Sequence, residues 1–145
     1  MRRDAKREAA FTIVEILVVV AIIGIMALMV VPRLSGRTEA ARRAAAQADI
    51  RANLAVALDL YELDNGAYPT TEQGLRSLVR KPGAAPVPPN WSGPYLKGGL
   101  PKDPWGNPYV YVYPGRQAGA YDLASWGGDG VEGGDDDIVN WETEN

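Results

Sequence analysis

A run of 21 almost entirely apolar residues, 11–31, constrains this chain of 145 residues more than any other feature. As an α-helix that rises 1.5 Å per residue, the run is roughly 31 Å long, which matches a bilayer hydrocarbon core of about 30 Å. Glu15 does not suit a membrane span, because no Lys or Arg lies within the run to pair with its carboxylate. A charge inside a bilayer costs about 3 kcal/mol on insertion scales, so Glu15 needs a cationic partner, a proton or a route to water.

Two simpler interpretations of the run are a cleaved secretory signal peptide and a plain single-span anchor. The run is longer than the ~7–15 residues of a signal-peptide core, and it ends at Val-Val-Pro-Arg without a small-x-small cleavage site. Four basic residues precede the run and four follow it, so the charge balance does not fix the orientation. A cut before Phe11 would create an amino group four residues from Glu15, the spacing of helical neighbours; the amine of an adjacent subunit could serve equally.

The segment FTIVEILVVVAIIGIMALMVVP resembles the start of type IV prepilins and of the pseudopilins of type II secretion. In that family, prepilin peptidase removes a short basic leader, the new N-terminal residue is N-methylated, and a Glu four residues on guides assembly. The resemblance implies a leader at residues 1–10 with cleavage after Ala10, where the family usually has Gly. It also implies methylation of Phe11, an assembly role for Glu15, a cytoplasmic leader and a periplasmic C-terminal domain.

The composition excludes several kinds of chemistry. The chain has no Cys, so it has neither a disulfide nor a thiolate metal site, and it has no His, the commonest general base. We therefore expect a protein that is not an enzyme. A net charge of −3 does not indicate a nucleic-acid partner. We interpret the pair Arg42 and Arg43 as a solvated face, with pairing to acidic groups of a neighbouring subunit as the alternative.

Residues 32–64 predict an amphipathic helix that continues from the apolar run. Pro32 and Gly36 are expected to kink or locally unwind it. An apolar stripe at helical spacing faces a core: Ile50, Leu54, Ala57, Leu58 and Tyr61. The sequence Asp-Asn-Gly ending at Gly66 predicts the helix end.

The second half, residues 65–145, contains 14 of the 16 Gly and most of the Pro, so it is expected to be rich in loops. A Thr70/Gln73 capping box predicts the start of a short second helix. The PKDPWGNP turns are expected to bury Trp105. Residues 109–113 and 120–125 predict two antiparallel strands, which gives an α+β fold class.

An acidic segment follows the strands, with four Asp and one Glu in residues 129–137. Its glycines let the backbone turn tightly and direct several oxygens inward. Hard oxygen donors without His or Cys favour Ca²⁺ over zinc, although the EF-hand spacing is absent. A flexible, solvated acidic tail is an equally good interpretation of these residues alone.

Three further motifs narrow the resemblance: YPTTEQGL, LPKDPWGNPY and GGDG followed by GG, acidic residues and Ile. Together they resemble the G-type major pseudopilins of type II secretion, which have a type IV pilin-like fold with a long N-terminal helix on a small domain. That family uses a calcium-binding loop where adhesive pilins have a disulfide. The resemblance implies side-chain ligands from Asp129 and Asp136, with Asp137 or Asp135 adding another. It also implies a backbone ligand from the Trp126 carbonyl.

The resemblance predicts a leader at 1–10, a transmembrane and assembly helix at 11–31, an amphipathic periplasmic helix at 32–64 and a periplasmic α+β domain at 65–145. The expected function is that of the major subunit of a periplasmic pseudopilus that drives export of folded proteins. The expected partners are other copies of the chain, minor pseudopilins, prepilin peptidase, the inner-membrane secretion platform and the membrane. A type IV pilin is one alternative. A single-span, calcium-binding periplasmic protein that does not polymerise is the other.

Overall fold

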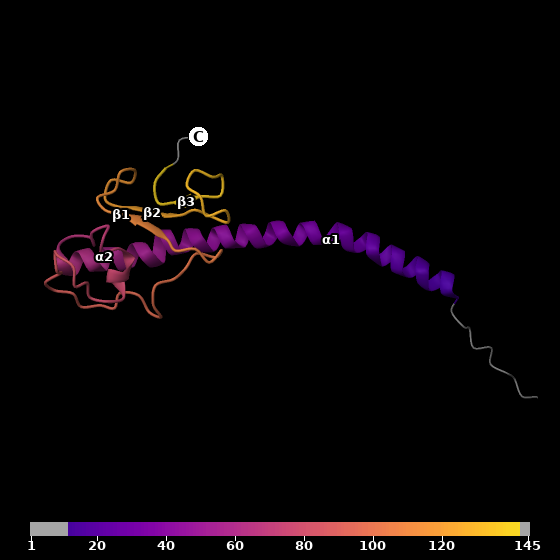
Figure 1. Ribbon diagram of the computed structural model, residues 1–145, viewed down its shortest axis with the longest axis horizontal. Coiled ribbons are helices and arrows are strands. Elements are labelled where there is room, and N and C mark those ends of the chain that lie inside the picture. The colour runs from indigo at the N-terminus through magenta and orange to yellow at the C-terminus, as the bar shows by residue number, and fades with distance from the viewer. Residues whose placement is uncertain (1–11, 143–145) are drawn as a thin grey trace, which may run out of the picture. The chain divides into compact units, whose positions relative to one another are not determined.

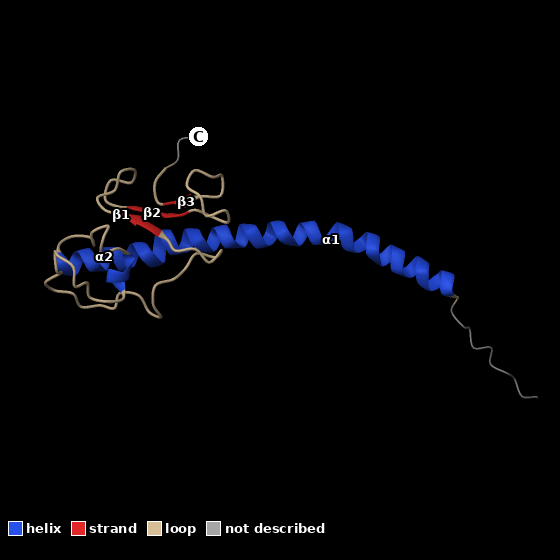
Figure 2. Ribbon diagram, viewed as in Figure 1, coloured by secondary structure: helices blue, strands red, loops and turns tan. Residues whose placement is uncertain are grey.

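The computed structural model describes the backbone of residues 12–142, and the side chains of residues 12–27 and 37–142. Its elements in chain order are α1 (Ile13–Ala48), the π-helical turn η1 (Asp49–Asn53), α2 (Leu54–Asn65), the 3-10 helix η2 (Leu75–Leu78), β1 (Val110–Val112), β2 (Asp122–Ser125) and β3 (Ile138–Val139) (Figure 1). Helices occupy the first half of the chain, and loops with three short strands occupy the second (Figure 2). Two compact units make up the chain, residues 1–39 and 40–145. The fold class is α+β, as predicted.

The backbone of α1 is helical through both Pro32 and Gly36, so the expected local unwinding there is not observed. A proline removes one N–H donor but leaves the remaining hydrogen bonds of the helix intact. The strong helix formers that follow, mostly Ala and Arg, then continue it. The irregular turn comes later, at η1, where the backbone widens to the i→i+5 pattern of a π-helix.

The predicted apolar stripe forms the helical side of the core, and each of its five residues is at most 2% exposed. Full burial of a side chain such as Leu58 stabilises the fold by about 1.5–3 kcal/mol relative to its exposure. The helix ends where the sequence predicts: Gly66 has φ 80°, and its N–H donates to the Glu62 carbonyl over 2.7 Å. Glycine adopts this left-handed conformation without steric cost.

The strands form one antiparallel sheet in the order β1-β2-β3, in which Tyr111 pairs with Leu123. Both residues face the helices, and Tyr109 and Tyr121 join them in the core. Buried hydroxyl groups find acceptors, since Tyr111 donates to the Pro69 carbonyl over 2.8 Å. The two predicted strands are confirmed. The two-residue β3 is too short to have an alternating pattern, so the sequence did not reveal it.

The Thr70/Gln73 capping box forms both of its predicted hydrogen bonds: the Thr70 N–H donates to Gln73 Oε1 over 3.1 Å, and the Gln73 N–H donates to Thr70 Oγ1 over 3.2 Å. The short helix begins later than expected, at Leu75, and is a 3-10 helix of four residues. The box therefore closes the turn before the helix rather than capping it. The tightness of a 3-10 turn suits so short an element.

Candidate functional site

The N-terminal site residues lie at the start of α1. Thr12 caps this helix, since its Oγ1 accepts a hydrogen bond of 3.2 Å from the Glu15 N–H. Glu15 is exposed in the first turn, where a carboxylate is favoured by the helix dipole. Ala10 and Phe11, the residues predicted for cleavage and methylation, lie outside the described residues.

The described apolar side chains of α1 between Ile13 and Met26 are exposed on all sides of the helix. Exposures run from 48% at Val19 to 81% at Ile13. Within the described part of the chain, no helix is both long and apolar enough to cross a membrane. Residue 11 and the side chains of 28–31, which belong to the expected span, are outside that part.

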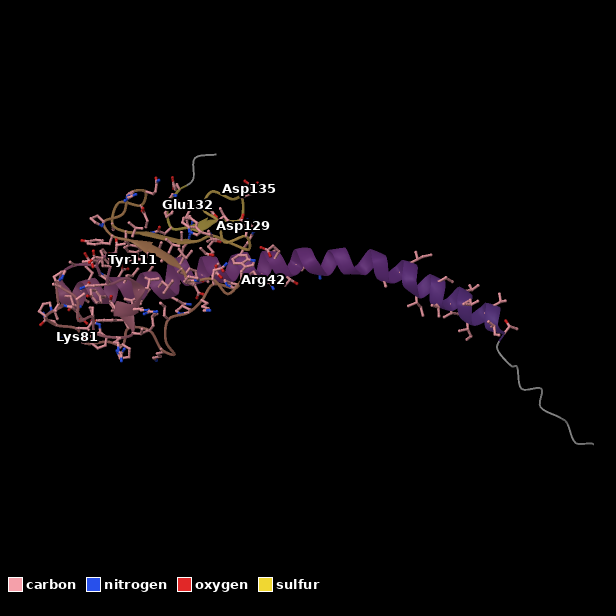
Figure 3. The ribbon with its side chains drawn as sticks, viewed as in Figure 1. Arg42, Lys81, Tyr111, Asp129, Glu132 and Asp135 are labelled. Carbon is pink, nitrogen blue, oxygen red and sulfur yellow. The ribbon has the colours of Figure 1, made fainter. Side chains whose placement is uncertain are left out.

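The second candidate site is the acidic loop, residues 126–137, which joins β2 to β3. Figure 3 labels Asp129, Glu132 and Asp135 on it. Asp136 lies inside the loop, where its Oδ2 accepts hydrogen bonds from the N–H groups of Gly128 over 2.6 Å and Asp129 over 3.3 Å. The bond from Gly128 is the main reason that the pKa of Asp136 lies below its ordinary value. These bonds fold the loop around one carboxylate.

Two glycines allow the loop backbone to approach Asp136. A Cβ on Gly134 would stand 2.6 Å from Asp136 Oδ1 and 3.2 Å from Asp129 Oδ2, and a Cβ on Gly127 would overlap the Asp136 carboxylate. Residues with side chains do not fit at either position. Both carboxylate oxygens therefore lie close to the same point beside Gly134, and the two acidic groups face each other.

Asp129 and Asp137 are also turned onto loop amides. Asp129 Oδ1 accepts from the Val131 N–H over 2.9 Å, and Asp137 Oδ2 accepts from the Gly133 N–H over 2.8 Å. The other oxygen of Asp137, Oδ1, is buried without a hydrogen-bond partner, the one such atom among the described side chains. A buried carboxylate oxygen in that state is costly unless something else binds it.

Asp135 and Trp126 take part through their backbone carbonyls. The Trp126 carbonyl accepts a hydrogen bond of 3.1 Å from the Gly130 N–H, and the Asp135 carbonyl accepts one of 3.1 Å from Arg43 Nη1 of α1. The Asp135 carboxylate belongs to an exposed residue. Arg43 is half-buried, so the prediction of a solvated face is wrong for Arg43, whereas Arg42 is exposed as expected.

The acidic loop meets one requirement of a calcium site and falls short of another. Its donors are hard oxygens, and the buried Asp137 Oδ1 awaits a partner. In the part of the chain that the structure describes, however, no three Asp or Glu side chains gather closely enough to hold a metal ion. The donor chemistry therefore fits Ca²⁺, while the carboxylates would have to move closer together to coordinate it.

A buried network that the sequence analysis missed supports the base of the loop. The Asp103 carboxylate, 4% exposed, accepts a hydrogen bond of 2.6 Å from the Ser125 hydroxyl. Ser125 Oγ accepts in turn from the Gly127 N–H over 3.2 Å, and Asn107 Nδ2 donates to the Gly127 carbonyl over 3.1 Å. Trp105, expected to be buried, is half-buried beside this network. The buried member of the DPWGN turn is its acid, because that carboxylate organises the turn.

Comparison with known families gives two matches. The profile of type II secretion system protein G matches residues 33–141, and the profile of the prokaryotic N-terminal methylation motif matches residues 5–31. The second match covers the predicted leader, cleavage site and apolar run. The first covers the acidic loop and the network below it.

Curated relatives and a solved structure agree with these matches. The chain is 52% identical to type II secretion system core protein G of Pseudomonas aeruginosa over 94% of its length and 97% of that protein. It is 51% identical to the protein of the same name from Escherichia coli K12, over 96% of this chain and 94% of the relative. A crystal structure of the major pseudopilin from the type 2 secretion system of enterohaemorrhagic Escherichia coli superposes with a TM-score of 0.67 and 45% identity, covering 74% of this chain and 89% of that one. The chain belongs to the type II secretion system protein G family.

Proposed function

We propose that this chain is the major structural subunit of the pseudopilus of a type II secretion system, a filament whose assembly drives export of folded proteins across the outer membrane. The observation that carries the proposal is the pair of family matches, which together span residues 5–141. The family consists of structural subunits, so the role asks for assembly rather than catalysis. The proposed partners are further copies of the chain, minor pseudopilins, prepilin peptidase and the inner-membrane platform.

The N-terminus is proposed to be processed before assembly. Prepilin peptidase would cleave after Ala10, and methylation would then modify the new terminus at Phe11. Glu15 would pair with the Phe11 amine of a neighbouring subunit. Its exposed position in the first turn of α1 supports this role, because the carboxylate is accessible from outside the helix.

The exposed apolar side chains of α1 support burial in a second environment. Side chains such as Ile13, 81% exposed, and Met26, 62% exposed, lose free energy by contact with water, and a continuous apolar surface marks an interaction site. We propose that residues 11–31 hold the subunit in the inner membrane before assembly, with the C-terminal domain in the periplasm. The same residues would pack against other subunits in the filament.

The acidic loop is proposed to bind Ca²⁺ through Asp129, Asp136 and Asp137, with Asp135 and the Trp126 carbonyl as further candidates. The buried, unpartnered Oδ1 of Asp137 supports this assignment. A bound divalent cation would neutralise part of the negative charge of the loop and hold its two ends together. The chain has no cysteine to cross-link this region.

The family matches favour a pseudopilin over a type IV pilin, since the protein G profile covers the whole C-terminal domain. A calcium-binding anchor that does not polymerise differs in one testable respect. Replacement of Glu15 by Ala should abolish assembly of a filament subunit, whereas a mere anchor would tolerate it. Glu72→Ala is the matched control, because Glu72 is exposed on a loop of the C-terminal domain.

The experiment is to express each variant in the native host lacking the wild-type chain and to measure filament in sheared fractions together with secreted protein. The intact mass of membrane-extracted protein is measured in parallel. We expect loss of residues 1–10 and gain of one methyl group in all variants, with filament and secretion lost only in Glu15→Ala. Normal filaments from Glu15→Ala, or a full-length mass for the wild-type chain, would contradict the proposal.

A further inference from the structure

The two adjacent arginines of α1 have different surroundings. Arg42 is exposed, whereas Arg43 is half-buried and donates from Nη1 to the Asp135 carbonyl across 92 residues of sequence. Helical geometry explains the difference. At ~100° per residue, Arg43 lies ~20° around the helix axis from the buried Ile50, while Arg42 lies ~80° away from it. Arg43 therefore extends the core-facing stripe of the helix by two turns.

The acidic loop needs a positive charge from another part of the chain. It has five carboxylates between residues 129 and 137, and the sequence contains no Lys or Arg after Arg116. The Arg43 guanidinium reaches the loop backbone at the residue before Asp136. Its charge also lowers the pKa of Asp136, in addition to the larger effect of the hydrogen bond from Gly128. Attraction to the loop therefore acts through both a hydrogen bond and charge.

We propose that Arg43 is a docking residue that fastens the acidic loop to α1, and that this contact couples the order of the loop to the order of helix residues 40–46. The guanidinium is a rigid, permanently charged donor, which suits it to hold a carbonyl within an acidic segment. Residues 40–46 are the first helical residues of the C-terminal compact unit. A contact at Arg43 thus stabilises the helix where that unit begins, and it stabilises the loop at the same time.

The contact goes beyond the proposed function, since it requires neither a bound cation nor a filament. It holds the loop close to the helix while the carboxylates are turned onto loop amides. Calcium and Arg43 would reduce the repulsion between the same carboxylates from different sides. Loss of Arg43 is therefore most visible when calcium is absent.

The test is hydrogen exchange followed by mass spectrometry on the full chain in detergent micelles with EDTA. Four proteins are compared: wild type, Arg43→Gln, Arg43→Lys and the matched control Arg42→Gln. We expect exchange in residues 127–137 and 40–46 to be about fivefold faster in Arg43→Gln than in Arg42→Gln, which corresponds to ~1 kcal/mol. Arg43→Lys keeps the charge and should fall between wild type and Arg43→Gln.

Three results would overturn the proposal. One is equal exchange in Arg43→Gln and Arg42→Gln. Another is faster exchange in the helix segment without any change in the loop, because the two would then be uncoupled. The third is an equal rise in residues 54–61, because a general loss of stability would then explain the effect. None of these results bears on filament assembly, which the Glu15 experiment tests separately.

Discussion

Replacement of Asp103 by Ala is the most informative test of how the acidic loop is supported. The Asp103 carboxylate accepts three hydrogen bonds: from the Trp105 N–H over 3.1 Å, the Asn107 N–H over 2.7 Å and the Ser125 hydroxyl over 2.6 Å. The first two close the DPWGN turn, and the third connects that turn to the residue before the loop. Removing the carboxylate breaks both functions at once.

The magnitude follows from the burial of each donor. Ser125 is 0% exposed, so an unpaired hydroxyl there costs about 1–3 kcal/mol. The two turn amides lie near the surface and can bond to water, so each loss costs about 0.5–1.5 kcal/mol. The expected destabilisation is roughly 4 kcal/mol, which lowers the Tm of a domain of this size by about 10 °C. Asp103→Asn retains one acceptor oxygen for the amides and should lose about 1–2 kcal/mol.

The assay is thermal and urea unfolding of the full chain in detergent, followed by tryptophan fluorescence. Glu72→Gln is the control, because it removes a carboxylate from an exposed side chain. Hydrogen exchange should also show faster opening at Gly127, whose N–H bonds to Ser125 Oγ. Unfolding of Asp103→Ala at the same temperature as Glu72→Gln would refute the role of this network.

Three further predictions follow from the core, the loop and the turn before β2. Leu58→Ala should destabilise the protein by about 2–5 kcal/mol in urea unfolding, because Leu58 is 0% exposed and its loss leaves a cavity. Gly134→Ala should disorder the acidic loop, measured by hydrogen exchange, because its Cβ would stand 2.6 Å from Asp136 Oδ1. Burial acts to raise the pKa of Asp122, but N–H bonds from Ala118, Arg116 and Gln117 bring it below its ordinary 3.8. The stability from Asp122 is therefore complete above pH ~4 and is lost as pH falls through the lower folded pKa, so Asp122→Asn should reduce acid sensitivity in pH-dependent unfolding.

The helical part of the fold was predictable because its information is local. A stripe at 3.6-residue spacing identifies the buried side of a helix without knowledge of its partner, and the glycine after Asp64-Asn65 marks its end. The two longer strands were predictable for the same reason, since tyrosine and valine alternate along β1. The π-turn η1 left no such pattern. It depends on tertiary contacts, such as the hydrogen bond of 2.8 Å from the Tyr109 hydroxyl to Asp49 Oδ2.

The supports of the acidic loop were not predictable from composition, because each joins residues far apart in sequence. Ser125 and Asp103 are separated by 22 positions, and Arg43 and Asp135 by 92. Either acid could have been a solvated charge. Arg43 did leave a usable signal, since it lies seven residues before Ile50 and so shares its helix face. An arginine in phase with a buried stripe is a candidate for a tertiary contact.

The geometry of the carboxylates explains how the loop tolerates its charge and remains able to bind a cation. Asp129, Asp136 and Asp137 each direct one oxygen at a loop N–H, which offsets the charge with backbone dipoles. The second oxygens of Asp129 and Asp136 meet beside Gly134, and that of Asp137 is buried without a partner. A cation that uses these second oxygens leaves the amide bonds in place. Calcium binding would then require the carboxylates to close around the ion, while the folded path of the loop is already set by its own backbone.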